Sequence, residues 1–157
     1  MSRRPSLWLA FPLSVFIAFL LAALPLPQAL AWWRPEFITM VLVFWVLQAP
    51  DRIGIWTGFL LGLVVDVLLA TPFGVHSLML AVVAWLARLS WRRVAVFSLL
   101  QTSGLVFVLI LLGLAVKRLA LGVVSTPPDS LLYWLPALTS ALVWPTLMLV
   151  LRRHVRR

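Results

Sequence analysis

The amino-acid sequence predicts an all-α integral membrane protein with six transmembrane helices packed into a compact bundle. Of its 157 residues, 64% are hydrophobic and only 11% are charged, and the mean hydropathy is +1.10. These fractions are far from those of soluble domains. The apolar residues also fall into runs close to the roughly 20 residues that cross a bilayer. Six crossings would use about 120 residues, which leaves too few for a folded soluble domain.

Charged residues and prolines separate the apolar runs and so place the six helices. A single transmembrane domain over 1–157 is expected, with helices at about 7–26, 36–49, 53–70, 73–87, 94–116 and 131–151. The loop after Lys117 is expected to be the longest. Asp129 or Ser130, near its end, is expected to cap the last helix, because both residue types favour that position.

Basic residues alternate along the chain between the two ends of the predicted bundle. Ten of the thirteen Lys and Arg residues fall on one side, namely Arg3, Arg4, Arg52, Arg88, Arg92, Arg93, Arg152, Arg153, Arg156 and Arg157. The other side holds Arg34, Lys117 and Arg118. Because cytoplasmic loops accumulate Lys and Arg, this asymmetry predicts that both termini lie in the cytoplasm.

The first predicted helix has an alternative interpretation as a secretory signal peptide that ends at Ala29-Leu30-Ala31. Its apolar run is longer than the roughly 7 to 15 residues usual for such a signal, which favours the membrane helix. Cleavage would leave five helices.

The composition also excludes several classes of function. The net charge of +9 does not indicate nucleic acid, because a nucleic-acid-binding surface needs a soluble face that these runs do not leave. Topology explains the charge, and binding of anionic lipid is an additional possibility. The chain has no cysteine, which rules out disulfides and thiolate metal sites. No catalytic, metal-binding or phosphate-binding motif is visible, so we expect neither a cofactor nor an enzymatic activity.

Small residues repeat every four positions in the third predicted helix. Gly54, Gly58, Gly62 and Asp66 follow one face, where the absence of side chains allows close helix packing. Two interpretations are open, which are contact with another helix of the same chain and contact with a partner protein. Asp66 is an ionisable group in a predicted span, where insertion costs about 2.5 to 3.5 kcal/mol near the bilayer centre. It therefore needs a polar neighbour or an outward-facing cavity.

His76 is the candidate for that neighbour. It and Asp66 each lie five residues from Thr71, at the tip of a tight turn, so they are expected at similar depth. A hydrogen bond or ion pair between them is one interpretation. A site that faces a ligand or partner, and a pair that handles protons, are the alternatives.

A polar stripe marks the fifth predicted helix. Ser98, Gln101 and Thr102 lie on one face, next to Gly104. Such groups commonly form hydrogen bonds between helices in membranes, which is the role expected for them here.

Together, these motifs resemble the MreD family of rod shape-determining proteins. The resemblance is carried by Arg34 and Pro35 at the start of the second predicted helix, by Pro50 and Arg52 in the turn before the third, by Gly58, Gly62 and Asp66, and by the later Gly74. The motifs cover residues 34–76, while length, six spans and a basic tail agree over nearly the whole chain. The roles of Gly58, Gly62 and Asp66 carry over by motif, whereas His76 has no counterpart in the pattern.

The resemblance implies a non-enzymatic component of the bacterial rod complex in the inner membrane. Such a protein supports lateral cell-wall synthesis and rod shape through association with MreC. Other implied partners are MreB, RodA with its transpeptidase partner, and membrane lipids. The implied fold is similar to the substrate-binding subunits of energy-coupling-factor transporters, and this leaves a second hypothesis, a small-molecule-binding transporter subunit. That function would need an enclosed polar pocket, for which the sequence offers few polar groups.

Overall fold

The computed structural model describes residues 7–155, which contain helices and loops and no strands. The elements are α1 (Leu7–Ala23), α2 (Gln28–Ala31), α3 (Phe37–Gln48), α4 (Ile55–Leu68), α5 (Val75–Val94), α6 (Leu99–Val124), the 3-10 helix η1 (Leu131–Trp134) and α7 (Leu135–Val155). The prediction of an all-α protein is therefore confirmed for the described residues.

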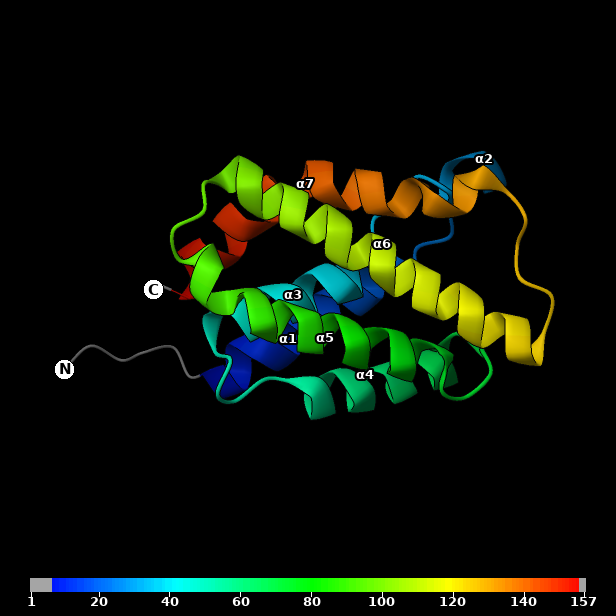
Figure 1. Ribbon diagram of the computed structural model, residues 1–157, viewed down its shortest axis with the longest axis horizontal. Coiled ribbons are helices and arrows are strands. Elements are labelled where there is room, and N and C mark those ends of the chain that lie inside the picture. Colours follow the sequence, from blue (N-terminus) through cyan, green and yellow to red (C-terminus); the bar gives the residue numbers. More distant parts are fainter. Residues whose placement is uncertain (1–6, 156–157) are drawn as a thin grey trace.

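The long helices run back and forth along one axis (Figure 1). Helix α1 begins and α7 ends at the same end of the bundle, where the loops at 49–54 and 95–98 also lie. The turns at 69–74 and 125–130 lie at the opposite end. Successive long helices are thus antiparallel, as expected for a chain whose loops alternate between the two sides of a membrane.

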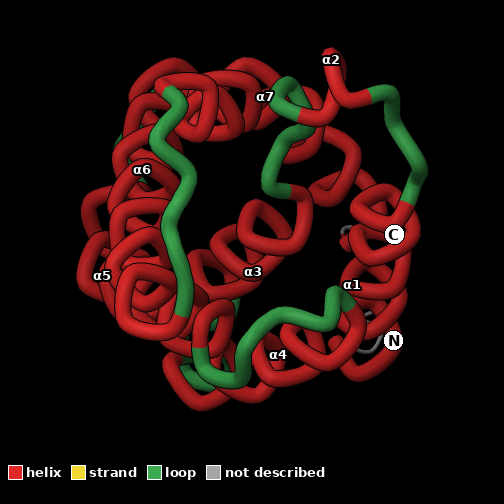
Figure 2. The backbone as a smooth tube through the Cα atoms, turned by 90° about the vertical axis from the view of Figure 1, so that its right-hand side faces the viewer, coloured by secondary structure: helices red, strands yellow, loops and turns green. Residues whose placement is uncertain are grey.

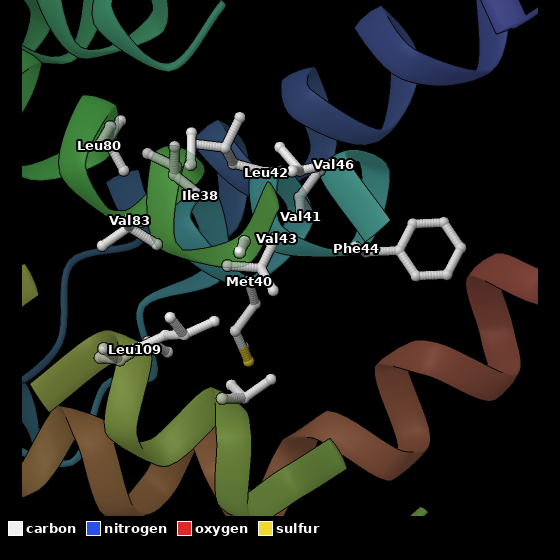
Figure 3. Packing of buried hydrophobic residues seen from close by; sticks show 14 of the residues in the cluster. Ile38, Met40, Val41, Leu42, Val43, Phe44, Val46, Leu80, Val83 and Leu109 are labelled. Carbon is white, nitrogen blue, oxygen red and sulfur yellow. The ribbon is translucent and has the colours of Figure 1, made fainter. Parts of the chain in front are cut away.

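Helix α3 forms the core of the bundle. It lies near the centre of the ring of other helices in Figure 2 and packs against α1, α5, α6 and α7. Residues 38–46 are all buried, as expected for a helix that is apolar on every side. Figure 3 shows Val83 of α5 and Leu109 of α6 among the side chains around it. The indole Nε1 of Trp45 donates to Ser14 Oγ at 2.8 Å, which links α3 to α1.

The first helices differ from their predicted ranges. Helix α1 ends at Ala23 rather than at residue 26, because Pro25 and Pro27 disfavour helical backbone in the residues before them. The short helix α2 after Pro27 was not predicted. Helix α5 continues to Val94 instead of ending near residue 87, since its last turn carries Arg92 and Arg93, which a helix accommodates well at its carboxyl end.

Helix α6 begins five residues later and ends eight residues later than the predicted range of 94–116. It begins at Leu99 and continues through Lys117 to Val124, because Lys and Arg are good helix formers and do not end a helix. The connection to η1 therefore covers only 125–130, and the expectation of a long loop after Lys117 was wrong. The hydroxyl of Ser130 accepts a hydrogen bond from the Leu132 N–H, so Ser130 caps η1.

The polar stripe of α6 has a local role instead of the expected interhelical one. Ser98 and Gln101 form a reciprocal capping box at the start of the helix, and Thr102 Oγ1 donates to the carbonyl of Ser98 at 2.9 Å. The expectation of bonds to neighbouring helices was wrong, because these side chains reach backbone groups of their own first turns.

Two helical stretches of the described chain are long and apolar enough to span a membrane on length and composition alone. They are Leu99–Val124 and Leu131–Val155, while Trp8–Ala23, Phe37–Gln48 and Ile55–Leu68 are apolar but shorter. Large apolar side chains, including Leu60 and Leu142, also lie exposed on the outside of the bundle. Such an outer surface suits contact with lipid.

Candidate functional site

The glycine stripe of α4 faces α5. A Cβ atom added to Gly62 would lie 2.3 Å from the Cα of Ser77, and one added to Gly58 would lie 2.7 Å from the carbonyl oxygen of Leu80. Real Cβ atoms essentially never approach other atoms so closely. At Gly54 the contact is looser, with the Arg88 guanidinium at 3.3 Å. Of the two interpretations left open by the sequence, the geometry supports contact within the chain, since α5 covers this face.

Asp66 lies at the end of the stripe, next to the first turn of α5. Its residue is only 1% exposed. The carboxylate accepts main-chain hydrogen bonds from Gly74 at 2.9 Å on Oδ2 and from His76 at 3.0 Å on Oδ1, with a longer one from Ser77 at 3.4 Å. The first N–H groups of a helix have no partner within the helix, and the helix dipole attracts negative charge there. Asp66 therefore caps α5 from a neighbouring helix.

Side chains complete the surroundings of the carboxylate. Thr71 donates its hydroxyl to Oδ1 at 2.8 Å, and Ser77 donates its hydroxyl to Oδ2 at 3.2 Å. His76 Nδ1 lies 2.8 Å from Oδ1, so the structure brings together the Asp66 and His76 side chains. We call Asp66, Thr71, Gly74, His76 and Ser77 the Asp66 cluster.

The turn between α4 and α5 depends on Gly74. This residue has φ +99°, a left-handed conformation that favours glycine, and it occupies the capping position of α5. Because glycine has no side chain to cap the helix, the Asp66 carboxylate supplies the missing acceptor. Turn and cap thus form one structural unit.

The hydrogen bonds of the Asp66 cluster indicate a structural role, which is to link the end of α4 to the start of α5. Both carboxylate oxygens already accept several hydrogen bonds, and these use the acceptor capacity that a ligand would need. Within residues 7–155, no group of three or more His, Asp or Glu side chains could hold a metal ion.

The other motif residues make separate contacts. The guanidinium of Arg34 donates to the carbonyls of Ala22 and Leu24, so it satisfies acceptors at the carboxyl end of α1. Pro35 directly precedes Glu36, which occupies the N-cap position of α3 without a side-chain capping bond. Pro50 and Arg52 lie in the loop at 49–54, with Arg52 exposed. These residues do not contribute hydrogen bonds to the Asp66 cluster.

Sequence reasoning missed two contributors to the packing. Ser77 supplies two donors to Asp66, and its position three residues after Gly74, within the first turn of a helix, was the signal that could have identified it. Gly113 of α6 lies so close to α5 that an added Cβ would be 2.7 Å from Cγ2 of Val83. A glycine in the middle of an apolar span was the available signal there.

Gly62→Ala tests the close approach of α4 and α5. The added methyl group would meet backbone atoms of Ser77, so the helices must separate, and we expect a loss of about 1 to 3 kcal/mol in unfolding free energy. Gly104→Ala is the control, because a Cβ there meets nothing within 4 Å and alanine favours the helix. Thermal unfolding of the purified proteins in detergent measures the difference. Equal stability of the two variants would disprove the contact.

Asp66→Asn tests the capping role. The amide keeps one acceptor oxygen but replaces the other with a donor, which must then face a main-chain N–H or a donating hydroxyl. We expect a lower unfolding midpoint, equivalent to about 1 to 3 kcal/mol. Asp129→Asn is the matched control, because that side chain is 89% exposed in its ion pair with Arg118. An Asp66→Asn protein as stable as this control would show that one acceptor is enough.

Comparison with known proteins identifies the family. The family described as rod shape-determining protein MreD matches residues 2–154. A protein named "Rod shape-determining protein MreD" from Haemophilus influenzae is 30% identical over 144 residues, which cover 90% of this chain and 87% of that protein. No solved structure matches the chain. A match along nearly the whole length shows that the chain belongs to the MreD family of rod shape-determining proteins.

Proposed function

We propose that this protein is a non-enzymatic scaffold of the rod complex, which spans the inner membrane six times and supports lateral wall synthesis through association with MreC. Membership of the family supports a role in determining rod shape. The observation that carries the scaffold role is the Asp66 cluster, in which the buried ionisable groups of α4 and α5 bind each other and the backbone. A bundle stabilised in this way has a fixed shape to present to partners.

The distribution of charge supports the proposed topology. The end of the bundle where α7 finishes carries Arg52, the Arg88, Arg92 and Arg93 group, and Arg152 with Arg153. Arg3, Arg4, Arg156 and Arg157 lie outside the described residues. The opposite end carries Arg34, Lys117 and Arg118, together with the acidic Glu36 and Asp129. By the positive-inside rule, the more basic end faces the cytoplasm.

The partner surface is expected on the outside of the bundle. The glycine face of α4 is covered by α5, so a partner cannot reach it without separating the two helices. The outer faces of the helices and the loops remain open for MreC, MreB, or RodA with its transpeptidase partner. The proposed fold, similar to substrate-binding subunits of energy-coupling-factor transporters, would leave these same surfaces accessible.

A small-molecule-binding transporter subunit is the alternative function. Such a subunit needs an enclosed pocket with convergent polar groups. The groove between α1 and α7, about 540 Å³ in volume, is lined almost entirely by apolar side chains. Its chemistry therefore does not favour a polar ligand.

Reporter fusions test the topology. Green fluorescent protein joined after Arg157 is expected to fluoresce, and alkaline phosphatase at the same position is expected to be inactive, because the carboxyl terminus lies in the cytoplasm. Alkaline phosphatase joined after Thr126, in the connection at the opposite end, is the matched control and should be active. The reverse pattern would overturn the orientation.

Depletion tests the function. We expect rod-shaped cells to become round when this protein is depleted, because lateral wall synthesis loses its scaffold. Gly104→Ala should restore rod shape and co-purify with MreC, whereas Asp66→Leu, which removes both acceptors at α5, should fail in both assays. Normal rods after complete depletion, in a cell without a related copy, would refute the assignment. A vitamin requirement with normal shape would favour the transporter alternative.

A further inference from the structure

A lateral groove between α1 and α7 takes no part in the Asp66 cluster. Its floor is α3, with Val41 and Trp45 buried, and its walls are α1 and α7, which touch each other at few points. The wall residues include Leu13, which is 60% exposed, and Val150. The described chain thus leaves an open apolar groove of about 540 Å³ on the outside of the bundle.

The dimensions and polarity of the groove fit one hydrocarbon chain. The lining residues of α1 extend from Leu9 to Leu21, a length of about 18 Å at 1.5 Å per residue. This length is close to one leaflet, about half of the 30 Å hydrocarbon core. The hydroxyl of Ser14 donates to the Phe11 carbonyl and accepts from Trp45 Nε1, both at 2.8 Å, so it offers little to a polar ligand.

Basic residues lie at one end of the groove. His154 lines it directly, and Val155 lines both the groove and a second hollow of about 190 Å³ that also contains Arg152. Arg153 completes the basic last turn of α7. Within residues 7–155, neither arginine belongs to an ion pair. This end of the groove thus offers the guanidinium groups of Arg152 and Arg153 at the level expected for lipid headgroups.

We propose that the groove binds one anionic phospholipid of the cytoplasmic leaflet. One acyl chain lies along α1 and α7 over Trp45, and the phosphate group lies beside Arg152, Arg153 and His154. Basic residues near a membrane surface each strengthen the binding of anionic lipid about five-fold. The inference rests on the proposed orientation of the protein in the membrane.

The charges favour a lipid over a transmembrane helix of a partner. Single-span helices usually carry Lys and Arg on their cytoplasmic side, and these would face Arg152 and Arg153 across the groove. Like charges repel, whereas a phosphate group would neutralise the two arginines. The groove therefore matches a lipid in both its apolar length and its charged end.

Photo-crosslinking of the full-length protein in lipid nanodiscs tests the site. The discs consist mainly of unlabelled phosphatidylcholine. A small fraction of the lipid is a photoreactive probe with a diazirine on one acyl chain, and this probe is either phosphatidylglycerol or phosphatidylcholine. We expect phosphatidylglycerol to label groove residues such as Leu13, Ile17 and Val150 several-fold more than phosphatidylcholine does. Peptide mass spectrometry locates the label.

Two pairs of variants separate the groove from the general lipid surface. Thr146→Trp fills the groove and should abolish its labelling, whereas Leu60→Trp, on an exposed face of α4, should not. Arg152→Gln and Arg153→Gln should each lower phosphatidylglycerol labelling about five-fold. Arg92→Gln in the last turn of α5 is the charge-matched control and should leave it unchanged.

Equal labelling by the two lipids, or full labelling of Thr146→Trp, would overturn the proposal. So would a photoreactive residue at position 146 that crosslinks in cell membranes to a partner protein and not to lipid. Labelling does not depend on cell shape, so failure of the lipid site and failure of the rod-complex function give different results.

Discussion

The helix arrangement depends on the contact between the Asp66 carboxylate of α4 and the amino end of α5. Helix α5 packs against α3, α4 and α6, so its position determines the relative positions of most of the bundle. In a membrane, no hydrophobic effect drives helices together, and packing and hydrogen bonds must hold them. Asp66 supplies this attraction because its buried carboxylate needs hydrogen-bond donors, and the amino end of α5 has free N–H groups that need an acceptor.

Close packing and capping act together in the hairpin of α4 and α5. The glycine face brings the two backbones together, and this distance allows the short side chain of Asp66 to reach main-chain donors of the next helix. A larger residue at position 62 would push the carboxylate away from His76 and Ser77. The left-handed Gly74 closes the turn between the helices. Each feature is therefore useful only when the others are present.

The close packing of α4 against α5 leaves the rest of the surface for contacts with other molecules. The ionisable groups buried in α4 and α5 are committed to the fold, so interactions with other molecules must use the outer faces, the loops and the groove beside α1. That groove combines apolar walls with two arginines at one end that belong to no ion pair within residues 7–155. In the proposed scaffold, such a site would connect the lipid of one leaflet to α7, the last helix of the chain.

The sequence alone determined the all-α class, the family and the residues that share the glycine face, because composition and four-residue periodicity are local properties. The equal spacing of Asp66 and His76 from Thr71 also indicated their proximity. Periodicity says which residues share a face, but not which neighbour covers it. Only the tertiary structure decided that α5 covers the stripe, that Asp66 binds backbone N–H groups, and that α1 and α7 leave a groove. These features depend on distances between segments that are far apart in the chain or joined by turns, and no local pattern encodes such distances.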